Sequence, residues 1–430
     1  MEKVKKNLPI ILAALIALAV VITLIAVLIA GKKGDEEKGS EDEYERPVIT
    51  ETRGVFVPTV FNLSFPSKAD LTEEELKTEI DTIVETAKNA GLNSIFFQVR
   101  PACDALYSSE YFPVSEYLST SGTAQFDCLA YFIEACHKEG IALHAWINPL
   151  RVSASFGDVS ELSSDNPALK IENSVVSYGG KLYFDPGIPE VRELICKGVK
   201  EICENYNVDG IIFDDYFYPY KVYETDDDGA KVAAVFADDE TYSTYGGDFS
   251  SVEDFRRSNI NSLIEGVYKT VKETDENCLF GVSCFGIWQN VNGDNGGSFT
   301  KGSESYSETY SDTLSWIEGG YVDYIAPQIY WETNNLAASY KVLAKWWDAR
   351  IEDSGVDLLI AHAAYKYDGT FDPESLEMTK QLTLTEELFN YKGSIFYSYN
   401  AIRDDLGGVT GEIIDYYTLK DLSDGEETEK

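Results

Sequence analysis

Histidine is scarce in this chain, with three residues among 430, and cysteine occurs only seven times. His137, His144 and His362 form no H-x-H or H-E-x-x-H spacing, and no two cysteines form a C-x-x-C pair. Those spacings are the usual sequence signs of zinc sites and of dense disulfide frameworks. We therefore predict no metal site, and we interpret most of the cysteines as small apolar core residues, with one disulfide left open.

A glycine-rich phosphate loop is also missing. No G-x-G-x-x-G or G-x-x-x-x-G-K-[ST] segment follows an apolar, strand-like segment, so we predict no nucleotide or other cofactor. Basic residues are few as well, with 35 Lys and Arg against 74 Asp and Glu and a formal net charge of -39. A surface of this charge repels phosphate backbones, which excludes nucleic acid as an expected partner.

The long apolar run of the chain lies near its beginning. Residues 8–30 contain only Leu, Ile, Val, Ala, Thr and Pro, and a run of this length can cross a bilayer as a helix. Three lysines precede the run, and only Lys32 and Lys33 follow it before the acidic residues begin. The positive-inside rule therefore places residues 1–7 in the cytoplasm and the rest of the chain outside. Because a cleaved signal usually has a shorter apolar region, we predict an uncleaved, single-pass anchor in the cell membrane.

The rest of the chain divides into a linker, one large domain and a short tail. Residues 31–50 are acidic with almost no apolar residue until their end, and we predict a disordered linker. Residues 421–430 have the same composition and are predicted as an acidic tail. Residues 51–420 are predicted to form a single globular domain.

Strand-like and helical segments alternate through residues 51–420. Eight such units favour a closed (β/α)8 TIM barrel in the α/β class over an open doubly wound sheet, which would more often carry an early phosphate loop. The predicted strands are Arg53–Thr59, Ser94–Pro101, Ala142–Arg151, Gly210–Pro219, Leu279–Gly286, Tyr324–Trp331, Leu358–Lys366 and Ser394–Ala401. The predicted helices are Leu71–Ala90, Phe126–Glu139, Pro189–Tyr206, Val252–Glu273, Tyr310–Gly319, Ala337–Asp353 and Pro373–Tyr391.

One stretch, VDGIIFDDYFYPY at residues 208–220, is typical of a buried strand that ends in a site. Its apolar run passes directly into Asp214 and Asp215, and then into aromatic residues that include Tyr216 and Tyr218. Aromatic rings beside carboxylates suit a sugar, whose C–H faces stack on rings while an acid and a base act on the glycosidic oxygen. The alternative is an acidic junction that caps a helix or binds a cation.

Polar and aromatic residues also occupy the ends of the other predicted strands. In barrels of this class the reacting groups come from the C-terminal ends of the strands, so we expect these residues to converge on one mouth. His144, Trp146 and Asn148 alternate, which puts them on one face of their strand. The strand-end residues outside 208–220 are Gln98, Arg100, His144, Trp146, Asn148, Gln328, Tyr330, Trp331, Glu332, His362, Tyr365, Tyr397, Ser398 and Tyr399.

Hydrolysis of a glycosidic bond needs two carboxyl groups, one protonated as the acid and one ionised as nucleophile or base. We predict that one of Asp214 and Asp215 pairs with Glu332, and that the other aspartate braces a loop, because adjacent strand residues face opposite ways. Two alternatives stay open. Glu332 could be a helix cap or loop carboxylate, and His144 could be a neutral imidazole packed inside the barrel.

Six segments resemble, in order, the motifs of the glycoside-hydrolase-like family 10. They are RGVFVPTVFNLSFPSK, FFQVRPACDALYSSEYFPVS, HAWINPLRV, FDPGIPEVRELICKGVKEIC, DGIIFDDYFYP and APQIYWE, and the match runs from Arg53 to about Asn400. The resemblance implies a (β/α)8 barrel of a bacterial secreted or membrane-attached protein. It also implies a glycoside hydrolase, since some members hydrolyse peptidoglycan glycan strands and prefer strands without peptides.

The resemblance assigns site positions residue by residue. Cys103 and Ile212 depart from the family pattern, which often has glycine and histidine there. The acidic positions fall on Asp214, Asp215 and Glu332. The pocket positions fall on Gln98, Arg100, Asp104, His144, Asn148, Arg151, Tyr216, Tyr218, Gln328, Tyr330 and Trp331.

Together these observations predict a membrane-anchored extracellular glycoside hydrolase whose partner is a polysaccharide of the cell wall or matrix, above all peptide-free peptidoglycan strands. Paired carboxylates would carry out the acid–base chemistry. The alternatives are a catalytically silent barrel that binds glycan and a hydrolase of an unrelated exported polysaccharide. The sequence does not predict an oligomeric state.

Overall fold

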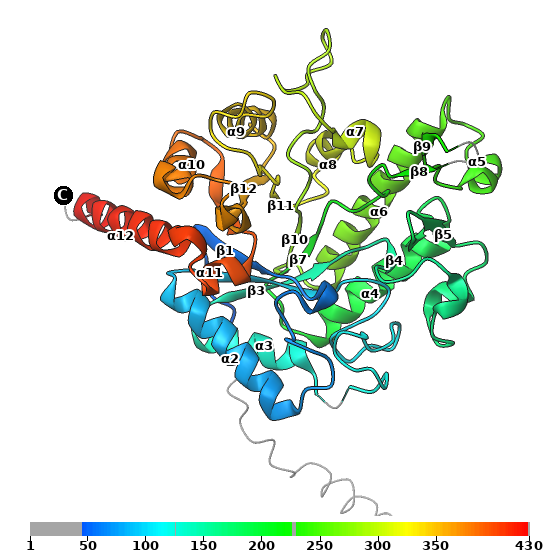
Figure 1. The fold of residues 1–430 in the computed structure, drawn as a ribbon, viewed down its shortest axis with the longest axis horizontal. Helices are drawn as coiled ribbons and strands as arrows, with labels where there is room; N and C mark the ends of the chain where they lie inside the picture. Colours follow the sequence, from blue (N-terminus) through cyan, green and yellow to red (C-terminus); the bar gives the residue numbers. More distant parts are fainter. Residues whose placement is uncertain (1–44, 125, 226–228, 429–430) are drawn as a thin grey trace, which may run out of the picture. The chain divides into compact units, whose positions relative to one another are not determined.

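The structure is a computed structural model, and it describes residues 45–428 except 125 and 226–228. Within this part of the chain, eight parallel strands close into a barrel in the order β1-β13-β12-β11-β10-β7-β3-β2 (Figure 1). The predicted (β/α)8 barrel is therefore confirmed. The barrel strands are β1 (Thr52–Val57), β2 (Ser94–Arg100), β3 (Ala142–Ile147), β7 (Gly210–Phe213), β10 (Leu279–Val282), β11 (Tyr324–Ile325), β12 (Asp357–His362) and β13 (Tyr391–Phe396).

Several strands end earlier than the apolar pattern predicts. β7 ends at Phe213 and β11 at Ile325, so the polar residues that follow leave the regular ladder and form the mouth of the barrel. The predicted third strand also divides, because β4 (Arg151–Ser153) turns away from β3 and pairs with β6 (Lys181–Phe184). β5 (Val175–Tyr178) completes that antiparallel sheet, and β8 (Tyr223–Thr225) pairs with β9 (Lys231–Ala233).

Six of the seven predicted helices begin and end within three residues of observed ones, whereas the helix predicted at Pro373–Tyr391 covers only Glu377–Thr385. The helices at 239–245, 305–308, 399–403 and 409–428 were not predicted. Thr72 is the N-cap of the first described one, as predicted: its side chain accepts the N–H of Glu75, whose carboxylate accepts the N–H of Thr72 at 2.8 Å. The helices are α2 (Glu73–Asn89), α3 (Cys128–Lys138), α4 (Pro189–Asn205), α5 (Asp239–Tyr245), α6 (Val252–Thr274), α7 (Ser305–Glu308), α8 (Thr313–Gly319), α9 (Tyr340–Arg350), α10 (Glu377–Thr385), α11 (Tyr399–Arg403) and α12 (Val409–Thr428).

Two apolar layers hold the barrel. The larger layer lies between the strands and the surrounding helices. The smaller one fills the barrel interior and consists of Phe56, Phe96, Trp146, Ile212, Tyr324, Ala326, Leu359, Ala361 and Ile395. Because side chains alternate along a strand, residues that follow Ile212 and Ala326 at even spacing continue toward the mouth.

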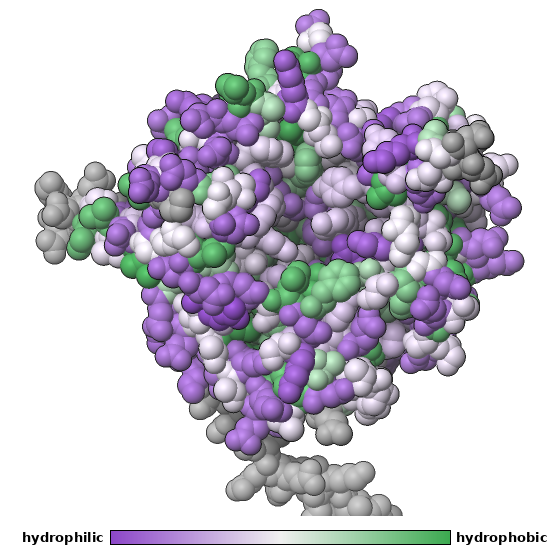
Figure 2. All heavy atoms as spheres, in the orientation of Figure 1, coloured by the Kyte–Doolittle hydropathy of each residue, from purple (hydrophilic) through white to green (hydrophobic). Residues whose placement is uncertain are grey.

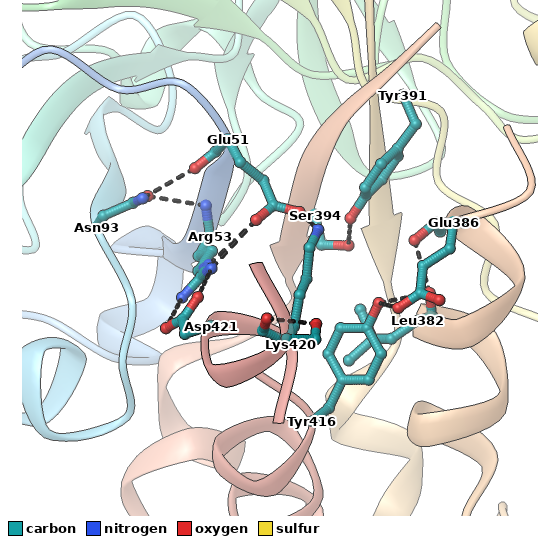
Figure 3. Close-up of polar contacts among 12 residues, drawn as sticks. Glu51, Arg53, Asn93, Leu382, Glu386, Tyr391, Ser394, Tyr416, Lys420 and Asp421 are labelled. Carbon is teal, nitrogen blue, oxygen red and sulfur yellow. Dashed lines mark hydrogen bonds and ion pairs between the residues drawn. The ribbon is translucent and has the colours of Figure 1, made fainter. Parts of the chain in front are cut away.

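The acidic tail differs from the prediction. Residues 421–428 continue α12 instead of being disordered, and Figure 3 shows how the helix is held. Arg53 of β1 donates to Asp421 at 3.0 Å and lies over the ring of Tyr417 at 4.2 Å, while Lys420 pairs with Glu51. The composition of the tail gives no hint of these partners, since they lie at the opposite end of the domain sequence.

The predicted membrane anchor, residues 8–30, lies outside the described residues, as does the linker as far as residue 44. In the described part of the chain, no helix combines the length and the apolar character needed to cross a membrane. The face in Figure 2 is largely hydrophilic, with hydrophobic residues in patches, as the excess of acidic over basic residues predicts.

Candidate active site

A cavity of about 370 Å³ opens where the strands end. Every one of the eight barrel strands contributes to it, either from its own end or from the segment that follows, as expected for a barrel of this class. Ten of the residues that we expect from the sequence at the mouth or in the pocket line this cavity. The cavity is lined by Phe56, Val60, Gln98, Trp146, Arg151, Asp214, Asp215, Tyr216, Tyr220, Ser283, Phe285, Gln328, Tyr330, Tyr365 and Tyr397.

Asp214 is a buried carboxyl group whose two oxygens accept different numbers of hydrogen bonds. The indole N–H of Trp146 donates to Oδ2 at 3.0 Å, and the amide of Asn148 donates to the same oxygen at 3.1 Å. Oδ1 receives only the backbone N–H of Tyr216, at 3.4 Å. Burial raises the pKa of Asp214 to about 7, with a further increase from the neighbouring charge of Asp215, while Arg151 and the two donors act in the opposite direction.

Asp215 has donors on both oxygens. The phenol of Tyr220 makes a short hydrogen bond to Oδ2, and the amide of Gln328 donates to Oδ1 at 2.9 Å. Gln328 is itself fixed by donating to the carbonyl of Ser283 at 3.1 Å. Burial raises the pKa of Asp215, and the bonds from Tyr220 and Gln328 oppose that rise because they stabilise the ionised form.

Contrary to the prediction, the two aspartates do not point in opposite directions. We expected one to face the mouth and the other to brace a loop, yet both line the cavity and both are almost fully buried. The prediction assumed that strand alternation continues through Asp214 and Asp215. The alternation holds from Ile212 to Asp214, but the backbone bends at Asp215, beyond the end of β7 at Phe213, and Asp215 also lines the cavity.

Arg151 supplies positive charge to this cavity from the first residue of β4. Its side chain is 7% exposed, and its guanidinium lies 4.8 Å from the centre of the Tyr216 ring. Nη1 donates to the carbonyl of Pro101 at 3.1 Å. Asn148 fixes the backbone by accepting the N–H of Arg151 at 2.9 Å, so one amide side chain positions both Arg151 and Asp214.

Aromatic side chains form much of the remaining wall. Tyr397 lies 6.0 Å from Phe56, 5.8 Å from Tyr365 and 6.2 Å from Tyr330, measured between ring centres. Burial raises the pKa of Tyr397 to about 12 and that of Tyr330 well above its usual value, so both are neutral phenols near neutral pH. Neutral rings of this kind offer stacking faces and hydroxyl groups to a sugar.

Glu332 is not among the residues that line the cavity. It lies half-buried beyond β11, where its carbonyl oxygen accepts the N–H of Asn335 and of Tyr340, each at 3.1 Å. Trp331 also lies outside the lining and packs edge-on against Phe285 at 5.9 Å. The structure thus brings Asp214 and Asp215 together but does not place Glu332 in the cavity with them.

Three further predicted pocket residues pack elsewhere. The register shift between Gln98 and Arg100 turns Arg100 away from the mouth, where its guanidinium lies 3.4 Å from the ring centre of Phe112. Tyr218 is buried 5.2 Å from the ring of Tyr310. Asp104 accepts the N–H of Ala102 at 3.1 Å in the loop after β2, and loss of solvent raises its pKa to about 6.

Two histidines are structural. His144 lies inside the barrel, stacked 4.5 Å from Phe96 and 3.0 Å from the hydroxyl of Tyr324, as the alternative interpretation expected. His362 is bonded to Gln381 at 3.0 Å and to Ser394 at 2.8 Å, away from the cavity. Burial lowers the pKa of each imidazole to about 4, so both are neutral at physiological pH.

Five lining residues were missed: Phe56, Val60, Tyr220, Ser283 and Phe285. Tyr220 closes the same stretch that contains Asp214, so its position next to the carboxylates was a usable signal. Val60 follows Thr59, and both backbone N–H groups donate to the side chain of Gln98, at 2.9 and 3.0 Å. No sequence pattern indicates that contact, because its partners come from different strands.

No group of three or more His, Cys, Asp or Glu side chains that could hold a metal ion occurs within residues 45–428, apart from the undescribed 125 and 226–228. All seven cysteines have free thiols. The polar groups that line the cavity are two carboxyl groups, one guanidinium, the indole N–H of Trp146, two side-chain amides, phenols and the hydroxyl of Ser283.

Comparisons with known proteins agree with this geometry. The family model described as Glycosyl hydrolase-like 10 matches residues 51–375. The protein called Glycosyl hydrolase YngK, from Bacillus subtilis (strain 168), is 39% identical over 366 residues, which cover 84% of this chain and 70% of that protein. Glycosyl hydrolase DigH from Escherichia coli (strain K12) is 35% identical over 374 residues, covering 80% of this chain and 82% of that protein.

Among solved structures, the catalytic domain of a β-amylase from Paenibacillus polymyxa has a TM-score of 0.54 at 13% identity, covering 87% of this chain and 99% of that domain. The glycoside hydrolase domain of PgaB from Bordetella bronchiseptica has a TM-score of 0.51 at 12% identity, covering 84% of this chain and 99% of that domain. At these identities the likeness shows the fold alone. The family match and the relatives show that the chain belongs to the glycosyl hydrolase-like 10 family and is a glycoside hydrolase.

Proposed function

We propose that this glycoside hydrolase cleaves the glycan strands of peptidoglycan, with preference for strands whose peptides have been removed. It would act outside the cell membrane, to which residues 8–30 anchor it. The resemblance of the motifs to a family with such members supports the substrate, and the apolar run supports the anchor. The cavity supports the chemistry, because buried carboxyl groups face aromatic walls that suit a sugar ring.

Asp214 is the proton donor in this proposal. The observation that carries the assignment is a buried carboxyl group whose pKa is raised to about 7, so that it holds its proton near neutral pH. Its Oδ2 already accepts from Trp146 and Asn148, which leaves Oδ1 to carry the proton toward the glycosidic oxygen.

Asp215 is the ionised partner. Donors from Tyr220 and Gln328 occupy both of its oxygens, an arrangement that favours the carboxylate over the protonated acid. An ionised carboxylate beside the anomeric carbon stabilises the positive charge that develops there as the glycosidic bond breaks. This pairing replaces the predicted pair of one aspartate with Glu332, which lies outside the cavity lining.

The test uses the full-length protein in detergent with peptide-free glycan strands, peptide-bearing strands and chitin oligosaccharides, and products are read by mass spectrometry. Asp214→Asn and Asp215→Asn should each lower turnover by about 100-fold or more, since acid–base groups contribute about 10² to 10⁴. Glu332→Gln should stay within about threefold of the parent, and the exposed Asp357 at the far end of β12 supplies the matched control Asp357→Asn.

Each outcome decides between stated alternatives. Short products from peptide-free strands would support the proposed substrate, whereas cleavage of chitin alone would indicate another polysaccharide. Strands that co-sediment with the parent protein without being cut would support a glycan-binding barrel. Loss of activity in Glu332→Gln would restore the pair predicted from the sequence.

A further inference from the structure

Arg151 is the one cationic side chain among the lining residues, all of which belong to the described part of the chain. The protein as a whole carries a formal net charge of -39, so the positive charge of Arg151 in the cavity is opposite in sign to the net charge of the protein. Placing a charged group at 7% exposure costs free energy unless a partner of opposite charge or hydrogen-bond acceptors compensate it.

That compensation is incomplete within the described residues. Nη1 of Arg151 donates to the carbonyl of Pro101, but Nε is buried without a hydrogen-bond partner, and Arg151 forms no ion pair. Two other poorly exposed arginines pair with carboxylates, Arg256 with Asp238 at 2.6 Å and Arg53 with Asp421. Arg100 also has no ion pair, but it is fully buried outside the cavity against the ring of Phe112, so among the cavity residues the unpaired guanidinium is that of Arg151. Asp214 and Asp215 lie close enough for Arg151 to lower their pKa values, yet neither bonds to it.

The guanidinium is also held in place before any ligand arrives. Its backbone is pinned by the side chain of Asn148 and by the pairing of β4 with β6, in which Arg151 lies opposite Tyr183. Its face is supported by the ring of Tyr216, at 4.8 Å. A fixed planar guanidinium with unused donors matches the geometry of a carboxylate, which it can bind through two parallel hydrogen bonds.

We propose that Arg151 binds a carboxylate carried by the substrate sugar next to the bond that is cleaved. The inference rests on the proposed function, in which that group is the lactyl carboxylate of a muramoyl residue. In peptide-bearing strands this carboxyl is an amide and carries no charge, so it can form no ion pair with Arg151. The preference for peptide-free strands then has a physical origin, and a hydrolase of the lactyl–peptide amide bond must act first to supply the substrate.

The experiment compares two substrates that differ only at that group. Peptide-free strands are used either native or with their lactyl carboxyls reduced to alcohols by carbodiimide activation and borohydride. For the full-length parent in detergent, kcat/KM should fall roughly 10- to 100-fold on the reduced strands, as expected for loss of a charge-assisted hydrogen bond. Arg151→Gln should be slow on native strands and show no difference between the two, and Arg151→Lys should recover part of the difference.

A control variant and a binding measurement separate this role from a structural one. Arg350→Gln removes a guanidinium that lies outside the cavity, bonded to the carbonyl of Gly296, and should behave as the parent does. Asp214→Asn, which should not turn over, allows calorimetric binding of native and reduced strands to be compared, with native strands binding more tightly.

The proposal is overturned if Arg151→Gln slows native and reduced strands by the same factor, because Arg151 would then act only on the aspartates. It is also overturned if the parent treats the two substrates alike, a result that does not depend on the variant folding. Cleavage of both substrates at equal rates refutes the role of Arg151 and leaves the proposed function standing. Absence of any strand cleavage refutes the proposed function itself, and the binding comparison then decides the role of Arg151.

Discussion

The hydrogen bond from Trp146 to Asp214 gives a direct test of the proton-donor assignment. The indole N–H donates to Oδ2 at 3.0 Å and favours the ionised carboxylate, which lowers the pKa of Asp214 from the value that burial alone would set. Trp146→Phe keeps an aromatic ring in the barrel interior but removes the donor. The folded-state pKa of Asp214 should therefore rise above about 7.

The size of the shift follows from the strength of that bond. A hydrogen bond to a charged group contributes about 1.5–3 kcal/mol, which corresponds to about one to two pKa units. Because Asp214 acts in its protonated form, its deprotonation produces the basic limb of the pH profile of kcat/KM. That limb should move about one unit or more toward higher pH in Trp146→Phe.

The assay is hydrolysis of peptide-free glycan strands between pH 4 and pH 10, with fluorescence or circular dichroism to show that the variant is folded. Tyr220→Phe is the matched control, because it removes a donor from Asp215 instead and should raise the pKa of that carboxyl. In that variant the acidic limb should move to higher pH while the basic limb stays. A basic limb that is unchanged in Trp146→Phe, or that moves only in Tyr220→Phe, would refute the assignment of Asp214 as the acid.

Three further predictions concern stability and location. The folded-state pKa of Asp214, about 7, lies above its unfolded value near 4, so the folded state binds the extra proton and the protein loses stability as the pH rises from about 4 to about 7. Asp214→Asn should therefore be more stable than the parent at pH 8, by up to about 4 kcal/mol, and nearly equal to it at pH 4. Thermal unfolding at both pH values measures the difference. Asp421→Ala removes an ion-pair partner of Arg53, and the Asp421 side chain is 58% exposed, so denaturant unfolding should show a fall in the free energy of unfolding of about 1 kcal/mol or less. A fall above about 2 kcal/mol would mean that α12 is held mainly through this pair. Deletion of residues 1–30 should move the protein from the membrane fraction to the soluble fraction, and retention in the membrane would contradict the predicted anchor.

The barrel was predictable because its signal is local. Apolar strand segments, helical spacing and the Thr72 cap all lie within short windows of sequence, and all eight barrel strands and six of the seven predicted helices were found near their expected places. Element ends were less predictable. β7 ends at Phe213 and β11 at Ile325, and beyond Ile325 the pairing continues only as isolated bridges from Gln328 to Phe285 and Ala361, which depend on the neighbouring strands.

The candidate site was likewise predictable in part. Asp214 and Asp215 stood out because carboxylates rarely follow a fully apolar run, and ten expected residues do line the cavity. Glu332, Arg100 and His362 satisfied the same rule of position, yet the structure places them outside the lining. Strand-end position alone does not tell which side of the barrel wall a side chain takes, since one register shift, as at Arg100, reverses it.

The sequence by itself determined the fold class, the family and the choice of Asp214 and Asp215 as candidate catalytic residues, since these depend on patterns along the chain. Only the tertiary structure decided what surrounds those carboxyls. The raised pKa of Asp214 comes from burial and from contacts with Trp146 and Asn148 on another strand, and Asp215 is held by Gln328, which lies 113 residues away. The protonation of a carboxyl group depends on its solvation and on nearby charges in space, and those are fixed only when distant segments pack together.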